Sequence, residues 1–212
     1  MQGMKLWLLE ILACPLDHAY PFECVIFRWA QHEKGKDLVK ACIEGYRQGT
    51  VNPDQTKSPV NFMDAENTIL LNDDLVIKPV PFPDYLSTLA MKIKELDVVH
   101  DQSTWAGEEA LTIIRGEIAQ QIDNGIARLK KAPDAIQQHA LLEELMPSLE
   151  FLNYVKYRME IEDAVLKCPQ CKRWYPVYET IPQLLPDGLR NKMHDAEFSE
   201  KWASKFHFGK LN

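Results

Sequence analysis

Three cysteines in two distant segments have the residue type and spacing of a metal site. Cys168 and Cys171 form a Cys-x-x-Cys pair, and the two-residue gap turns both sulfurs to one side of a tight turn. An aromatic, β-prone run that begins at Trp174 follows this pair, as in a zinc-ribbon knuckle. Cys14 is the best candidate for the other half of the site. The spacing therefore predicts one module built from both ends of the chain.

Three residues are candidates for the fourth ligand. Asp17 occupies the position of a second knuckle cysteine, and a carboxylate oxygen binds zinc. His18 is the next residue, and zinc usually prefers its imidazole to a carboxylate. We rank these two equally, with Cys24 behind them. An alternative interpretation is that the thiols hold no ion and pack as small hydrophobic groups.

Composition and charge limit the possible functions. The chain has 212 residues, five cysteines and a formal net charge of −7. An acidic chain is a poor fit to a protein that mainly binds phosphate backbones, since such proteins usually carry a basic excess. The odd cysteine count fits a reducing cytoplasm better than a disulfide framework. No apolar run reaches the ~18 residues of a membrane span, so we expect a cytoplasmic, metal-bearing protein.

The middle of the sequence is predicted to be helical. Apolar residues recur at helical spacing from about residue 103 to 131 and from 133 to 164. The short connection at residues 130–133 favours an antiparallel hairpin, and Pro147 should bend its second helix. We expect these stripes to be packing faces rather than a cofactor pocket.

The sequence offers no recognisable machinery for catalysis. It contains no glycine-rich loop after a strand that would hold a nucleotide cofactor. No nucleophile, base and orienting group occur at a recognisable spacing. Paired carboxylates such as Glu108-Glu109 and Glu143-Glu144 lie in polar helical context and are interpreted as solvated faces. We therefore expect that the chain is not an enzyme.

Motifs at both ends together resemble the tRNA-methyltransferase-activator family. They are Leu8-Leu9-Glu10-Ile11-Leu12-Ala13-Cys14-Pro15, the distant Cys-x-x-Cys, Tyr175-Pro176-Val177 and Ile181-Pro182-Gln183-Leu184-Leu185-Pro186. The resemblance covers about residues 4–20 and 165–190. It implies a zinc-ribbon-like subunit, and eukaryotic members of the family carry a helical insertion where this chain has its long middle.

The resemblance also implies a function as a partner subunit. Members of this family bind and stabilise class I, S-adenosylmethionine-dependent methyltransferases that act on tRNA, rRNA or a translation termination factor. They pair a strand with the edge of the enzyme's sheet and cover its apolar surface. The contact residues implied here are Trp174, Tyr175, Val177, Ile181, Pro182, Leu184 and Leu185. Nucleic acid would be contacted only through the enzyme. The alternative for these residues is an internal hairpin packed on the insertion.

The expected architecture is α+β. A discontinuous zinc-ribbon-like module occupies residues 1–24 and 165–190, an α-helical insertion residues 25–164, and a helical or flexible tail residues 191–212. In the tail, Phe198, Trp202 and Phe206 share one helical face, which predicts packing on the insertion or, alternatively, capture of a partner.

Two other functions remain as alternatives. The first is a nucleic-acid-binding zinc ribbon that uses Lys167, Lys172 and Arg173 for charge and Trp174 for stacking. The second is a structural scaffold in which the insertion has diverted the module from its original role.

Overall fold

The computed structural model describes residues 3–30, 38–49, 58–66, 68–131 and 134–208 of the chain. The chain divides into two compact units. The first contains Met1–His32, Val98–Glu108 and Met159–Asn212, and the second contains Glu33–Asp97 and Glu109–Arg158. The first unit therefore combines both ends of the chain with a short segment from its middle.

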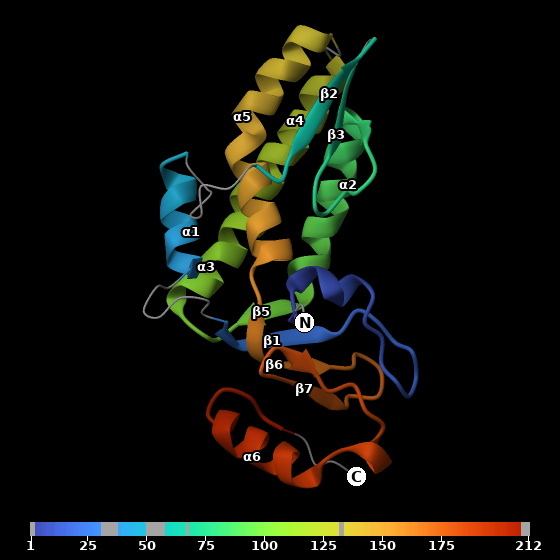
Figure 1. Cartoon of the computed structure of the whole chain (residues 1–212), viewed down its shortest axis with the longest axis vertical. Coiled ribbons are helices and arrows are strands. Elements are labelled where there is room, and N and C mark those ends of the chain that lie inside the picture. Colours follow the sequence, from blue (N-terminus) through green and yellow to red (C-terminus); the bar gives the residue numbers. More distant parts are fainter. Residues whose placement is uncertain (1–2, 31–37, 50–57, 67, 132–133, 209–212) are drawn as a thin grey trace. The chain divides into compact units, whose positions relative to one another are not determined.

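A five-stranded sheet forms the centre of the first unit (Figure 1). Its strands are β1 (Glu23–Trp29), β5 (Val99–Asp101), β6 (Ile161–Lys167), β7 (Trp174–Tyr178) and β8 (Ile181–Pro182). Their order is β5-β1-β6-β7-β8, in which β1 and β5 are parallel and every other pair is antiparallel. The short 3-10 helix η1 (Leu6–Glu10) precedes this sheet in the chain. The predicted α+β class is confirmed, and the two-residue strand β8 lies at one edge of the sheet.

Two strands of this sheet contain residues that the sequence analysis assigned to the helical insertion. Residues 25–29 belong to β1, and residues 161–164 belong to β6. The helical spacing of apolar residues ends at Met159, because Glu162 and Asp163 occupy the next positions of the stripe, so the predicted helix extended past its own pattern. β6 instead pairs with β1 on one side and β7 on the other, and this non-local pairing buries residues on both of its faces.

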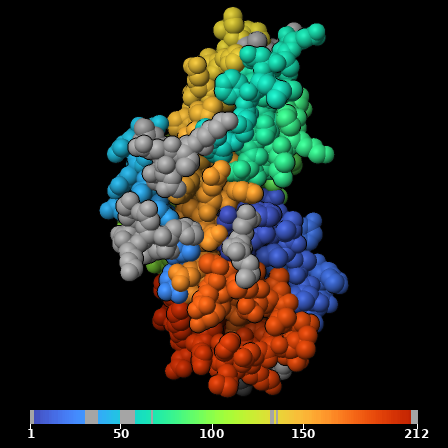
Figure 2. Space-filling view, in the orientation of Figure 1, coloured from blue at the N-terminus to red at the C-terminus, as the bar shows by residue number. Residues whose placement is uncertain are grey.

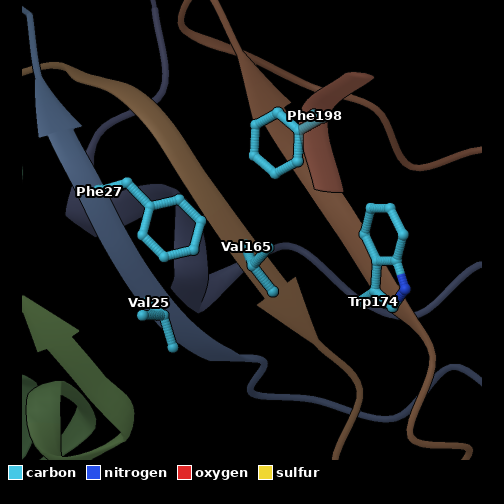
Figure 3. Packing of buried hydrophobic residues seen from close by; sticks show 5 residues of the cluster. All are labelled: Val25, Phe27, Val165, Trp174 and Phe198. Carbon is cyan, nitrogen blue, oxygen red and sulfur yellow. The ribbon is translucent and has the colours of Figure 1, made fainter. Parts of the chain in front are cut away.

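A C-terminal helix covers one face of the sheet. Helix α6 (Lys192–Trp202) begins after Asn191, whose side chain accepts hydrogen bonds from the backbone N–H groups of Met193 and His194. Five buried side chains form the shared core in Figure 3: Val25, Phe27, Val165, Trp174 and Phe198. Trp202, Phe206 and Phe208 pack against this core, and the Trp202 ring stacks 4.8 Å from that of Phe27. The aromatic tail therefore packs on the sheet, where Phe27 of β1, a residue of the predicted insertion, and Trp174 of β7 offer flat apolar surfaces.

Helices predominate in the second unit. They are α1 (Leu38–Arg47), α2 (Phe82–Lys94), most of α3 (Trp105–Ile113), α4 (Ala119–Lys131) and α5 (Ala135–Asn153). Helical turns η2 (Glu95–Val98), η3 (Ile114–Ile118) and η4 (Tyr154–Arg158) extend α2, α3 and α5. Pro147 lies inside α5, and residues 132–133 of the predicted hairpin connection are outside the described residues. A Cβ at Gly125 would lie 3.2 Å from Leu86 and 3.3 Å from Leu145, so this glycine permits close packing of three helices.

A small antiparallel sheet completes the second unit. Its strands β2 (Asn61–Ala65), β3 (Thr68–Asn72) and β4 (Val80–Pro81) are adjacent in that order. Ile69 and Leu71 are fully buried on β3, whereas all of β2 is exposed. The middle of the chain is therefore less purely helical than its sequence predicts.

Candidate metal centre and docking edge

Four side chains from the two ends of the chain converge in the first unit. The ligand atoms of Cys14, Asp17, Cys168 and Cys171 all lie within 4.8 Å of one another. The Cys14 and Cys171 sulfurs are 3.7 Å apart, and Cys168 Sγ is 3.4 Å from Asp17 Oδ2. Two sulfurs bound tetrahedrally at ~2.3 Å are separated by about 3.8 Å, so the spacing fits a zinc-like ion. The donor set of three thiols and one carboxylate can thus hold a tetrahedral metal ion.

Local backbone structure positions each half of this site. Cys14 follows η1, and its N–H donates to the carbonyl of Ala19, while its own carbonyl accepts from the N–H of His18. Cys168 follows β6, and its N–H donates to the carbonyl of Arg173 across the knuckle. Backbone N–H groups of Gln170 and Cys171 both lie 3.4 Å from Cys168 Sγ. These donors stabilise negative charge on the sulfur, as a thiolate ligand requires.

The ionisation of the ligands reflects these contacts. The N–H of Ala19 donates to Asp17 Oδ1 at 3.0 Å and lowers the pKa of that carboxyl to about 2. Burial raises the pKa of the Cys14 thiol, but hydrogen bonds from Tyr175 and the backbone outweigh it, so the net shift is downward. Burial raises the pKa of Cys168 to about 11 despite its backbone donors. A bound cation would favour all of these groups in their charged forms.

The geometry separates Asp17 from the other candidates for the fourth ligand. His18 is exposed and is not among the converging ligands of the described residues. Cys24 is fully buried in β1 and also lies outside this group, and burial raises the pKa of its thiol. Cys42 is a buried core residue of α1. Asp17 is therefore the side chain that completes the set of four.

The predicted partner-contact residues fall into two groups. Trp174, Tyr175 and Val177 are buried in β7, where all three pair with residues of β6 and Val177 also pairs with Pro182 of β8. These three side chains are therefore not exposed in the isolated chain, and their contact with a partner stays a prediction. Ile181 is 48% exposed and Leu185 39% exposed, and Pro182 and Leu184 are partly exposed. The accessible part of the predicted contact set is β8 and the segment that follows it.

A groove lies beside this exposed segment, between it and α6. Its volume is about 560 Å³, and its apolar lining includes Tyr178, Leu185, Leu189 and Phe198. In Figure 2 the orange-to-red surface of the C-terminal residues adjoins the blue surface of the N-terminal residues, since both build the first unit. Exposed apolar side chains beside a groove are typical of interaction surfaces.

The basic residues of the knuckle are engaged within the protein. Lys167 lies 3.7 Å from Glu23, and Arg173 lies 2.9 Å from Asp187. Lys172 donates to the carbonyl of Pro169. With Trp174 buried under α6, the structure offers little support for a nucleic-acid-binding knuckle that depends on these residues.

One contact of this site was not predicted from the sequence. The Tyr175 hydroxyl lies 3.4 Å from Cys14 Sγ, whereas Tyr175 was predicted only as a partner contact. Side chains alternate along a strand, so Tyr175 must face away from the sheet side on which Trp174 meets α6. This alternation could have predicted the contact from the sequence, but only if the side of the sheet that holds the metal ligands had been known.

The chain is similar to a known protein family. A family model described as "Trm112p-like protein" matches residues 5–179. No curated protein and no solved structure matches the chain. Within the described ranges, no helix has the length and apolar character needed to cross a bilayer.

Proposed function

Because the chain belongs to the Trm112p-like family, whose members are known as activators of methyltransferases, we propose that it is a non-catalytic partner subunit of such enzymes. Its targets are class I, S-adenosylmethionine-dependent methyltransferases that act on tRNA, rRNA or a translation factor. The family match over residues 5–179 is the observation that carries this proposal. Nucleic acid is contacted through the bound enzyme, in the cytoplasm.

The ion of the metal centre is zinc in this proposal. Cys14, Asp17, Cys168 and Cys171 supply four protein ligands, and zinc accepts thiolate and carboxylate ligands in a tetrahedral arrangement. Four protein ligands leave no open position for substrate or water, so the role of the ion is structural. The ion would tie the loop that carries Cys14 to the knuckle before β7.

The methyltransferase docks along β8 and the segment that ends at Leu185. An edge strand offers backbone donors and acceptors to a strand of another protein. Ile181 and Leu185 add exposed apolar surface next to those groups, and the neighbouring groove gives room for side chains of the enzyme. Burial of this surface against the enzyme would stabilise both proteins.

The test is co-purification with charge placed in the docking surface. The double variant Ile181→Asp, Leu185→Asp should lose the class I methyltransferases that mass spectrometry identifies with the native protein at stoichiometric amounts. Both side chains are at least 39% exposed, so the fold of the free protein should survive, as circular dichroism would show. The two new carboxylates would lose their hydration in an apolar interface, and this cost should prevent binding of the enzyme.

Met91→Asp is the matched control, since Met91 is an exposed apolar residue of the second unit. It should leave the amount of co-purified enzyme unchanged. Unchanged co-purification by the double variant would refute the docking assignment. Recovery of no methyltransferase with the native protein would refute the proposed function itself.

A further inference from the structure

Tyr175 occupies a position between the metal centre and the core of the first unit. It is fully buried in β7, where it pairs with Leu166 of β6. Its hydroxyl lies 3.4 Å from the sulfur of Cys14, a contact between residues 161 positions apart in the sequence. From this geometry we propose that Tyr175 is a positioning residue that fixes the Cys14 sulfur for metal binding. The inference rests on the metal centre of the proposed function.

Cys14 differs from the other two cysteines in its place in the chain, although its sulfur, like that of Cys168, also accepts backbone hydrogen bonds. Cys168 and Cys171 belong to one knuckle, in which backbone N–H groups hold Cys168 Sγ and the sequence spacing fixes both sulfurs together. Cys14 belongs to a separate loop between η1 and β1, and the two halves are joined only through tertiary contacts. The hydroxyl of Tyr175, which follows the knuckle in the sequence, contacts the sulfur of Cys14 in the N-terminal loop and so links the two halves of the site.

The ring of Tyr175 is itself held from two directions. Phe22 meets it edge-on, with ring centroids 5.8 Å apart and an interplanar angle of 69°. The Arg190 guanidinium lies 5.6 Å from the ring centroid of Tyr175, and its Nη1 donates to the carbonyl of Trp174 at 2.7 Å. A hydroxyl on a ring fixed in this way faces the Cys14 sulfur from one direction and can donate its proton to the thiolate form of that sulfur. Outer contacts of this kind orient ligands and tune the bound metal.

The inferred role predicts a defect in metal binding rather than in folding. Tyr175→Phe retains the ring and its packing but removes the donor to Cys14. We expect affinity for zinc, measured by competition with a chromogenic chelator, to fall about 10- to 100-fold, the usual effect of losing an outer-shell partner. With cobalt as the probe, the sulfur-to-metal charge-transfer band should move to lower energy, because the Cys14 thiolate loses a hydrogen bond.

Tyr85→Phe is the matched control. Tyr85 is also fully buried, and its hydroxyl donates to Asp73 in the second unit. This variant loses a buried tyrosine hydroxyl without touching the metal centre, so zinc affinity and the cobalt spectrum should stay unchanged. An equal loss of affinity in both variants would show a general effect of lost stability and would overturn the positioning role.

Two further outcomes distinguish this inference from the metal site on which it rests. Zinc affinity of Tyr175→Phe within twofold of the native value would overturn the inference and leave the site intact. Failure of the native protein to bind zinc or cobalt would overturn both. If Tyr175→Phe does not fold, NMR of the native protein loaded with cadmium decides the question. The Tyr175 hydroxyl proton should then exchange with solvent more slowly than in the cadmium-free protein, and equal exchange would refute the role.

Discussion

The buried ion pair between Arg190 and Asp195 should be a principal anchor of α6. Nε and Nη2 of Arg190 lie 2.9 and 3.0 Å from the two carboxylate oxygens of Asp195, and the two side chains are 4% and 9% exposed. Asp195 lies in the first turn of α6, where a negative charge also suits the helix dipole. Asp195→Ala would leave the buried Arg190 cation without its carboxylate partner, while its hydrogen bond to the Trp174 carbonyl remains. Breaking a buried pair in this way costs about 3–5 kcal/mol of unfolding free energy.

Urea unfolding followed by far-ultraviolet circular dichroism measures this loss. Tryptophan fluorescence adds a local signal, because Trp174 and Trp202 both pack in the core that α6 covers. Glu144→Ala makes the same type of change in the exposed Arg128–Glu144 pair, whose side chains are 52% and 61% exposed. That control should cost about 0–1 kcal/mol. A loss below about 1 kcal/mol for Asp195→Ala would refute the argument that burial makes this pair strong.

Two further variants test the metal centre and a buried carboxyl. Asp17→Ala should lower zinc affinity at least about 10-fold in chelator competition, because a direct ligand matters no less than an outer-shell partner. His18→Ala should leave zinc affinity unchanged in the same assay. Loss of affinity in His18→Ala but not in Asp17→Ala would assign the fourth ligand to His18. Burial raises the pKa of Asp101, although hydrogen bonds from Ser103 and Trp29 oppose the shift. The folded protein thus binds this proton more tightly than the unfolded chain, so the stabilisation is complete below about pH 3.9 and is lost as pH rises through the folded pKa. The difference in unfolding free energy between the native protein and Asp101→Asn should therefore fall with rising pH in urea titrations, and a constant difference would contradict the burial argument.

The local part of the metal site could be predicted from the sequence. Two residues lie between Cys168 and Cys171, so their convergence follows from a single turn. Asp17 was as good a candidate as His18 until the tertiary structure placed one near the three sulfurs and left the other exposed. The long helices α4 and α5 were also predictable, since their apolar residues repeat over several turns.

The sheet of the first unit could not be predicted in the same way. β1 and β6 pair across most of the chain, and β5 contributes only Val99–Asp101 from its middle. Short strands carry few periods of a pattern, and no local signal shows which distant strand will pair with them. The burial of Trp174 could not be predicted for a similar reason. α6 covers the face of the sheet on which Trp174 lies, and no local signal in the sequence shows which surface α6 will pack against.

The separation of β1 from β6 sets an order of assembly on the ribosome. β1 ends at Trp29, whereas its antiparallel neighbour begins at Ile161, after the whole second unit, Glu33–Asp97 and Glu109–Arg158, has been synthesised. At about 5–20 residues per second, translation separates the two strands by on the order of 10 s. During that interval the apolar side chains of β1, Val25 and Phe27 among them, lack their β6 and β7 neighbours. We expect the second unit to fold first and β1 to be the segment of the nascent chain most in need of a chaperone.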